Sequence, residues 1–335
     1  MLEQILRGMA TLRTRWHAAY GRLPVNLQGA CWLLLSAFLF TISAVMIKQL
    51  GTELDGFQVA LFRAMAGLMF ALPFLYRAGV NSLKTQYPVL QMTRSLAAAG
   101  AITASFYAII HLPLATATTL GFSRSLFLVP LAIVFLNETV GKRRIFATLA
   151  GFVGVVIVLR PSVTMDVAAL AALLAALCAS IAAVIVKIVT RTDSPATLIF
   201  YSGALSTLIL CVPASLVWQM PRLDQWFLLI VMGGFSVSSQ GCFIRAFSIG
   251  EATALAPVDY TRLLFATIAG YIFFANLPDI WTLIGSAVIV GSTLYITRRE
   301  AKLGKAHVPP PPIAVQQSGF PPYESEVHSD DNDKS

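Results

Sequence analysis

Residues 122–127 read Phe-Ser-Arg-Ser-Leu-Phe, and residues 260–265 read Tyr-Thr-Arg-Leu-Leu-Phe. The arginines at their centres, Arg124 and Arg262, lie 138 positions apart, and the same register continues without a gap for more than thirty residues. Further pairs at an offset of 138 or 139 are Arg160 with Arg298 and Lys48 with Lys187. We therefore interpret the chain as an internal duplication.

The composition excludes a soluble protein. Of the 335 residues, 57% are hydrophobic and 12% are charged, whereas globular domains carry roughly 25% charged residues. Apolar windows of about twenty residues alternate with short polar breaks, which is the pattern of membrane-spanning helices. Ten spans are predicted, over residues 27–47, 57–76, 89–110, 116–136, 143–160, 168–189, 196–218, 226–248, 252–275 and 280–297. The predicted fold class is an all-α integral membrane protein.

The predicted topology places five spans in each half, and an odd number inverts the second copy relative to the first. Lys and Arg in the breaks gather on one side, and such residues are retained in the cytoplasm. Both termini are therefore expected to be cytoplasmic, and the net charge of +8 reflects topology rather than nucleic-acid binding. The expected organisation is an amphipathic cytoplasmic lead-in (1–26), a first repeat (27–160), a second repeat (161–299) and a disordered cytoplasmic tail (300–335).

Several short segments occur in an order typical of a known family. They are Leu112-Pro-Leu-Ala-Thr-Ala117, Leu136-Asn-Glu138, Gly151-Phe-Val-Gly-Val155 with Arg160-Pro161, and Asp259-Tyr-Thr-Arg-Leu263. Over residues 27–300 the chain resembles the EamA-type ten-helix members of the drug/metabolite transporter superfamily. The resemblance implies a solute site near the middle of the membrane, lined by spans one, three, four, six, eight and nine. It also implies a multi-pass protein of a bacterial inner (plasma) membrane, in contact with lipid and a small-molecule metabolite.

Arg124 and Arg262 are the basic residues that lie deepest in the predicted spans. At 1.5 Å per residue they stand roughly 12 and 15 Å inside a core about 30 Å thick, where charges face a cavity or a partner. A guanidinium binds a carboxylate or phosphate through two parallel hydrogen bonds, so the two residues are candidate ligands of an anionic group. Asp259 is one turn from Arg262 and is either its structural partner or a proton-coupling site.

Aromatic side chains are expected to complete an apolar site. The candidates are Phe106 and Tyr107 in the third span, Phe243 in the eighth, and Tyr260 beside Arg262; for each of them, packing against helices or lipid is the alternative. Nearer the span ends lie Lys48, Lys187, Arg63 and Arg94. We expect these four to act in gating or in a vestibule, or to extend toward the lipid phosphates.

The predicted function is secondary transport of a small organic metabolite by alternating access, with a carboxylate or phosphate on the solute. Amino acids, nucleoside-like cofactors and vitamins are all compatible with this function. The sequence specifies neither the direction of transport nor whether it is coupled to an ion. The alternative is a multidrug or amino-acid exporter of the same superfamily. An intramembrane lipid-modifying enzyme is remote, because paired acidic motifs, His/Glu metal spacing and a phosphate-binding glycine loop are missing. We expect no catalytic residue, cofactor or metal, and the sequence is compatible with a homodimer.

Overall fold

The computed structural model describes residues 24–78, 85–136, 141–159, 166–189, 193, 195–250 and 252–302. Almost all of the expected lead-in and tail lies outside these described residues, as do Glu138 and Arg160. Within them the regular elements are α-helices, which confirms the all-α class. Six helical stretches are long and apolar enough to cross a membrane, and α3 and α9 contain shorter apolar segments.

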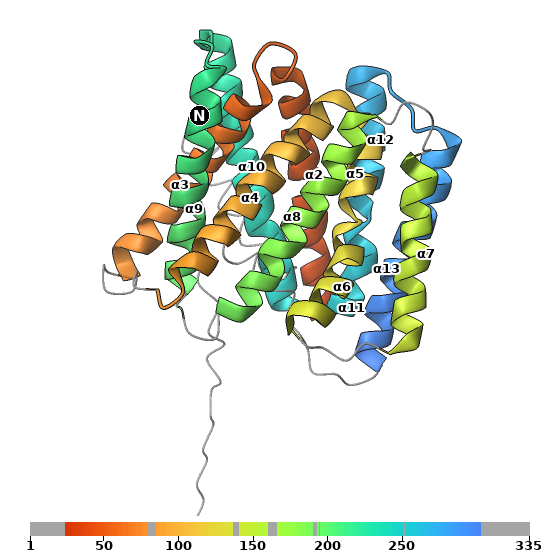
Figure 1. Ribbon diagram of the computed structural model, residues 1–335. Helices are drawn as coiled ribbons and strands as arrows, with labels where there is room; N and C mark the ends of the chain where they lie inside the picture. Colours follow the sequence, from red (N-terminus) through yellow and green to blue (C-terminus); the bar gives the residue numbers. More distant parts are fainter. Residues whose placement is uncertain are drawn as a thin grey trace, which may run out of the picture.

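The helices follow the predicted spans closely (Figure 1). They are α2 (Val25–Leu50), α3 (Gly56–Ala78), α4 (Pro88–His111), α5 (Leu114–Gly121), α6 (Arg124–Leu136), α7 (Lys142–Leu159), α8 (Val167–Val189), α9 (Pro195–Leu216), α10 (Leu223–Ile249), α11 (Ala252–Asp259), α12 (Thr261–Phe274) and α13 (Ile280–Lys302).

Two spans that were expected to be continuous are each divided in two. A turn at Phe122 and Ser123 separates α5 from α6, and Tyr260 separates α11 from α12. At the first break the amide of Ser123 donates to the carbonyl of Leu120, an i to i−3 bond of the 3₁₀ type. Phe122 keeps right-handed dihedral angles (φ −67°, ψ −18°), as does Tyr260 (φ −72°, ψ −10°). Each break therefore distorts the helix without reversing the chain.

The two arginines lie directly after these breaks. Arg124 is the first residue of α6 and Arg262 the second residue of α12, so neither lies within an uninterrupted helix. In Figure 1, α5 and α12 occupy one half of the bundle height and α6 and α11 the other. Both breaks therefore lie part-way along the height of the bundle.

Helices of the first half pack on helices of the second half. The main pairs are α2 with α10, α4 with α8, α3 with α9, and α7 with α13. Where α2 crosses α10, the Ser36 hydroxyl donates to the Ser239 carbonyl at 2.8 Å and the Ser239 hydroxyl donates to the Ser36 carbonyl at 2.9 Å. Small hydroxyl side chains allow two helices to approach closely and satisfy polar groups in an apolar surrounding.

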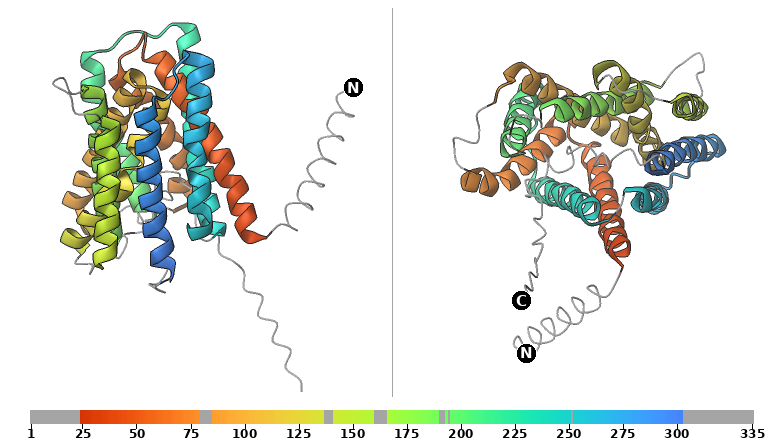
Figure 2. Two further views of the ribbon diagram at one scale, coloured as in Figure 1. Left: turned by 90° about the vertical axis from the view of Figure 1, so that its right-hand side faces the viewer. Right: turned by 90° about the horizontal axis from the view of Figure 1, so that it is seen from below.

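The contact between α7 and α13 relies on two glycines. A Cβ atom on Gly285 would lie 2.7 Å from the Gly154 carbonyl oxygen and 2.4 Å from a methyl group of Val158. The two backbones therefore touch, and these helices form one side of the bundle (Figure 2).

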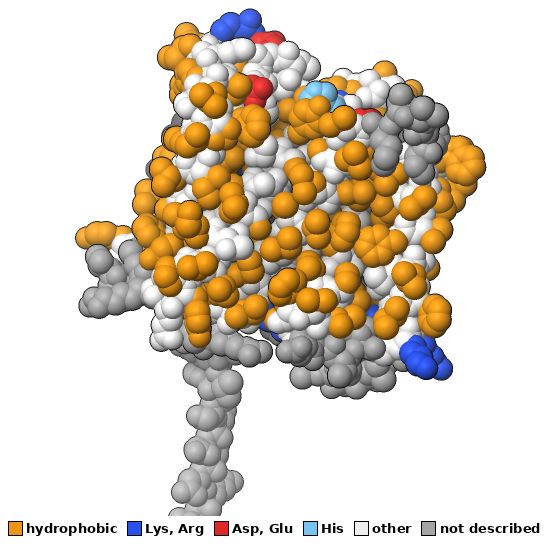
Figure 3. Space-filling view, in the orientation of Figure 1, with side chains coloured by type: hydrophobic (Ala, Val, Ile, Leu, Met, Phe, Trp, Pro, Cys, Tyr) orange, Lys and Arg blue, Asp and Glu red, His pale blue; other side chains and the backbone are white. Residues whose placement is uncertain are grey.

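The outer surface is apolar over the height of the bundle. Large hydrophobic side chains on α2, α3, α7, α10, α12 and α13 are exposed, and Figure 3 shows Lys and Arg concentrated toward the two ends of one face. Such a surface is stable in lipid rather than in water. The start of α2 and the end of α13 lie at the same end of the bundle (Figure 2). The protein is a multi-pass membrane protein.

Candidate functional site

Arg262 and Asp259 form a loose ion pair across the break between α11 and α12. The distance from Arg262 Nη2 to Asp259 Oδ1 is 3.7 Å, with the side chains 20% and 25% exposed. This is longer than the upper limit of about 3.2 Å for an N–H···O hydrogen bond. Arg262 Nε and Asp259 Oδ1 are buried and make no hydrogen bond. The pair thus compensates charge while leaving hydrogen-bonding capacity unused.

Aromatic rings from two other helices face the Arg262 guanidinium. Its Cζ atom lies 4.4 Å from the ring centre of Phe40 on α2 and 5.9 Å from that of Phe243 on α10, distances typical of cation–π contacts. Phe243, a candidate from the sequence analysis, thus lies near Arg262. Phe40 was missed, because it is one apolar residue among many in α2 and only the fold brings it to Arg262.

Arg124 belongs to the same electrostatic environment. The Asp259 charge attracts its guanidinium and the Arg262 charge repels it, so ionisable side chains from both halves act on one another. The Arg124 side chain is exposed, and its carbonyl accepts a hydrogen bond from the Ser180 hydroxyl of α8 at 2.9 Å. The backbone of Arg124 is thus held by α8.

The two breaks meet through residues that correspond in the duplication. The rings of Phe122 and Tyr260 contact each other edge to face, with centroids 4.8 Å apart. Helices α6 and α12 begin beside this contact. The amides of Ser125 and Leu126 already donate to the carbonyls of Phe122 and Ser123, so the charge at the breaks comes mainly from side chains. Two arginines opposed by one carboxylate favour an anionic group.

Two predicted aromatic residues lie elsewhere. Phe106 is 4% exposed in a hydrophobic cluster with Ile47, Leu50 and Val59, which packs α4 against α2 and α3. Tyr107 is exposed near the end of α4, where its ring lies 4.2 Å from that of His111. Neither side chain contacts Arg262 in this structure.

Lys48 caps the end of α4. Its Nζ donates to the carbonyls of Ile110 at 3.1 Å, of Ile109 at 3.3 Å and of Leu112, and it lies 5.4 Å from the ring centre of Phe274. The final carbonyls of a helix carry no intrahelical partner and attract cations. Lys48, expected to act in gating or a vestibule, is thereby engaged in joining α2 to α4.

The other three basic candidates differ in their surroundings. Arg94 is 2% exposed and donates from Nη2 to the Leu198 carbonyl at 2.5 Å, which ties α4 to α9. Arg63 is half-buried on α3, and among the described residues no acceptor pairs with its guanidinium. Lys187 is half-buried in the last turn of α8. None of the three contacts the Arg262 and Asp259 pair.

A buried carboxylate that the sequence analysis missed is Asp193. It accepts hydrogen bonds from the Gln91 side chain at 3.0 Å, from the Gln86 amide at 3.3 Å and from the Thr85 hydroxyl. The sequence offered one indication of this role. Asp55 stands 138 positions earlier, just before α3, and accepts a hydrogen bond from the Phe57 amide at 2.8 Å. Asp193 thus links the start of α4 to the residues before α9. Among the described residues no group of three potential metal ligands is found.

A lipid-facing helical bundle with ionisable groups at two internal helix breaks defines a membrane transport protein. The EamA-like transporter family matches the chain twice, over residues 27–160 and 166–298. The chain belongs to this family, within the drug/metabolite transporter superfamily, and it is a transporter rather than an enzyme.

Several characterised relatives cover most of the chain. The S-adenosylmethionine uptake transporter of Rickettsia prowazekii (strain Madrid E) is 35% identical over 286 residues, covering 84% of this chain and 96% of its own. The riboflavin transporter of Brucella anthropi is 32% identical over 250 residues, covering 72% and 88%. The pseudopaline exporter CntI of Pseudomonas aeruginosa is 27% identical over 277 residues, covering 81% and 96%. A solved crystal structure with 18% identity matches 84% of the chain at a TM-score of 0.54, which supports the fold alone.

Proposed function

We propose that this protein carries a small metabolite bearing a carboxylate across a bacterial inner membrane by alternating access. The observation that carries the proposal is the incompletely satisfied Arg262 and Asp259 pair, which lies within the electrostatic reach of Arg124. A buried ion pair with unused hydrogen-bonding atoms is costly unless a ligand or water completes it. A solute carboxylate would supply the acceptors that the two guanidinium groups lack.

The proposed mechanism uses two inverted five-helix repeats with cytoplasmic termini. An offset of 138 residues maps α2 onto α8, α4 onto α10 and α6 onto α12. The contact of α2 with α10 then corresponds to that of α8 with α4, and the contact of α6 with α8 to that of α12 with α2. All four contacts occur. The two broken helices run in opposite directions along the bundle (Figure 1). Both features support two copies related by an axis in the membrane plane, which can rock about a central site.

S-adenosylmethionine is the first substrate to test. It is named for relatives at 34–36% identity that match over 82–84% of this chain, and its chemistry fits the site. Its carboxylate matches Arg124 and Arg262, its ammonium matches Asp259, and its adenine or sulfonium group can lie against aromatic rings. Riboflavin, the second candidate, has no carboxylate and would depend on the aromatic residues Phe40, Phe122, Phe243 and Tyr260 instead.

The test is exchange of labelled substrate in proteoliposomes that are preloaded with the same unlabelled compound. Exchange does not depend on the direction of transport or on ion coupling. Wild-type protein is expected to exchange S-adenosylmethionine, whereas Arg124→Ala and Arg262→Ala should lower exchange at least tenfold, since a lost charged hydrogen bond costs about 1.5–3 kcal/mol. Arg222→Ala removes an exposed arginine, on the loop before α10, and is the matched control.

Three outcomes would contradict the proposal in different ways. Riboflavin exchange that survives both arginine substitutions would assign the site to neutral aromatic solutes. Exchange of a cationic drug that requires Asp259 alone would favour the multidrug alternative. If Arg124→Ala and Arg262→Ala both exchange S-adenosylmethionine as fast as the wild type, the two arginines have a structural role and do not bind the solute.

A further inference from the structure

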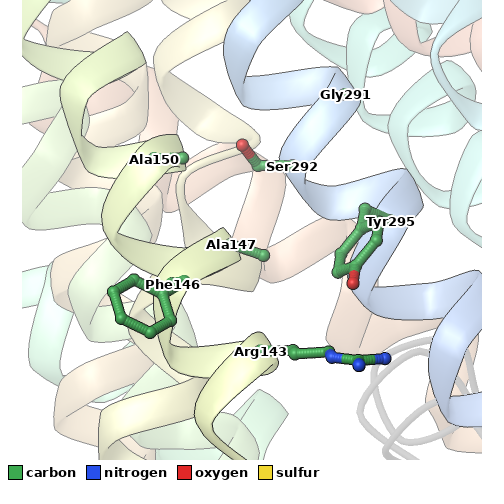
Figure 4. A pocket seen from close by; sticks show the side chains of 7 residues that line it. All are labelled: Arg143, Phe146, Ala147, Ala150, Gly291, Ser292 and Tyr295. Carbon is green, nitrogen blue, oxygen red and sulfur yellow. The ribbon is translucent and has the colours of Figure 1, made fainter.

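The outer face of α7 and α13 carries a shallow, open groove. Its volume is about 440 Å³. Seven residues line it: Arg143, Phe146, Ala147, Ala150, Gly291, Ser292 and Tyr295 (Figure 4). It is distinct from the candidate transport site, because none of its lining residues contacts Arg124, Asp259 or Arg262 in the interactions described above.

The groove arises from the way the two helices cross. They touch at Gly154 and Gly285, and the groove lies between the start of α7 and the second half of α13. Its floor consists of small residues, and a Cβ atom on Gly291 would meet nothing within 4 Å. Phe146 and Tyr295, both exposed, border this floor. An extended hydrocarbon chain is the shape that fits a shallow apolar channel of this kind.

One end of the groove is cationic. Arg143 is exposed in the first turn of α7, and among the described residues no carboxylate pairs with it. Figure 4 shows its guanidinium at the end of the groove toward which the Tyr295 hydroxyl points. Lys142 and Arg298, both exposed, are near the same helix ends. A guanidinium and a tyrosine hydroxyl beside an apolar channel match a phosphate headgroup joined to an acyl chain.

We propose that this groove binds an anionic phospholipid, with its phosphate at Arg143 and one acyl chain along Ala147, Ala150 and Gly291. A second copy of the protein fits less well. A symmetric contact through this groove would place two Arg143 side chains at the same membrane depth and near each other, where like charges repel. Basic pockets between helices on the cytoplasmic side of membrane proteins commonly hold acidic lipids.

The experiment is native mass spectrometry of the full chain in detergent, titrated with phosphatidylglycerol or with phosphatidylcholine of the same acyl chains. Wild-type protein should retain phosphatidylglycerol preferentially. Arg143→Gln should weaken its retention by roughly fivefold, the effect of one basic residue at a lipid surface, and Arg143→Lys should restore part of it. Gly291→Leu, which fills open space, should reduce the retention of both lipids.

Arg222→Ala is the matched control and should leave lipid retention unchanged, because it removes an exposed arginine far from the groove. Each variant is first shown to keep the thermal unfolding midpoint of the wild type. If wild type and Arg143→Gln each retain phosphatidylglycerol and phosphatidylcholine equally, the proposal is overturned, and the groove holds only non-specific lipid of the surrounding bilayer. A dimer that disappears in Gly291→Leu, without any lipid preference, would assign the groove to a second copy. Neither result depends on the transported substrate.

Discussion

At the scale of single residues, the basic side chains inside the helices divide by what they contact. Lys48 and Arg94 donate to backbone carbonyls of neighbouring helices, and such contacts join elements. Arg262 contacts a carboxylate at 3.7 Å and an aromatic ring, and Arg124 lies in the field of the same carboxylate. Charge inside a membrane is costly. Lys48 and Arg94 offset that cost through contacts with backbone carbonyls, and we propose that a solute anion offsets it for Arg124 and Arg262.

Substituting Lys48 tests the structural assignment. Lys48→Met should lower the free energy of unfolding by about 2 kcal/mol, because it removes a charged donor from the carbonyls that end α4. The measurement is the thermal unfolding midpoint in detergent, with Lys142→Met at an exposed position as control. An unchanged midpoint accompanied by lost transport would instead support the gating role predicted from the sequence.

The long distance between Arg262 and Asp259 predicts a small coupling energy between the two side chains. A double-mutant cycle with Arg262→Gln and Asp259→Asn should give a coupling energy of at most about 1 kcal/mol without ligand, because the two groups make no hydrogen bond. Unfolding of each variant in detergent provides the four free energies. A coupling of several kcal/mol would identify the pair as a tight structural ion pair and would weaken its assignment to solute binding.

At the scale of elements, the breaks in two helices and the glycine contact between two others shape the bundle. The turns at Phe122 and Tyr260 place the starts of α6 and α12 part-way along the height of the bundle. The crossing of α7 and α13 needs two backbones in contact at Gly154 and Gly285. Helix propensity alone predicts neither feature, because glycine weakens an isolated helix by about 1 kcal/mol relative to alanine.

Two glycines of the same helix should respond to alanine in opposite ways. Gly285→Ala should destabilise the protein by about 1–3 kcal/mol, because its Cβ would clash with α7. Gly291→Ala should be neutral or stabilise by up to about 1 kcal/mol, because its Cβ enters open space and alanine favours the helix. Thermal unfolding midpoints measure both, and equal effects would contradict the described crossing.

At the scale of the whole molecule, the apolar surface and the charge at its ends determine how the protein sits in the bilayer. Glu53 and Arg222 pair at one end, at 2.5 Å, whereas the basic start of α7 lies at the other. Basic residues are retained in the cytoplasm. The proposed orientation therefore places Glu53 and Arg222 outside the cell and Lys142 inside it.

Labelling of single cysteines tests this orientation. In a background with the four native cysteines replaced, Asp224→Cys should react with a membrane-impermeant maleimide on intact spheroplasts. Lys142→Cys should react only after the membrane is opened, because both original side chains are exposed but are expected on opposite sides. The reverse pattern would invert the topology, and labelling of both positions on intact cells would exclude a single orientation.

From the amino-acid sequence alone, an all-helical membrane protein of the EamA-like family could be predicted, because mean apolarity over twenty residues is a local property and apolar helices of that length are stable in lipid. It also marked Arg124, Asp259 and Arg262, since an ionisable residue far from a span end is expected to face a partner or a cavity, and it added Tyr260 and Phe243 as aromatic candidates. The proposed duplication rests on matching positions in the sequence.

The three-dimensional packing was needed to show which helices break and which basic residues already have partners. The turn at Phe122 depends on hydrogen bonds that replace those of the helix, and Phe40 reaches Arg262 only because α2 packs on α10 and α12. Lys48 caps the end of α4, and Asp193 accepts a hydrogen bond from Gln91 of α4. The contacts of Phe40, Lys48 and Asp193 join residues separated by dozens to hundreds of positions, and local pattern carries no information about such partners.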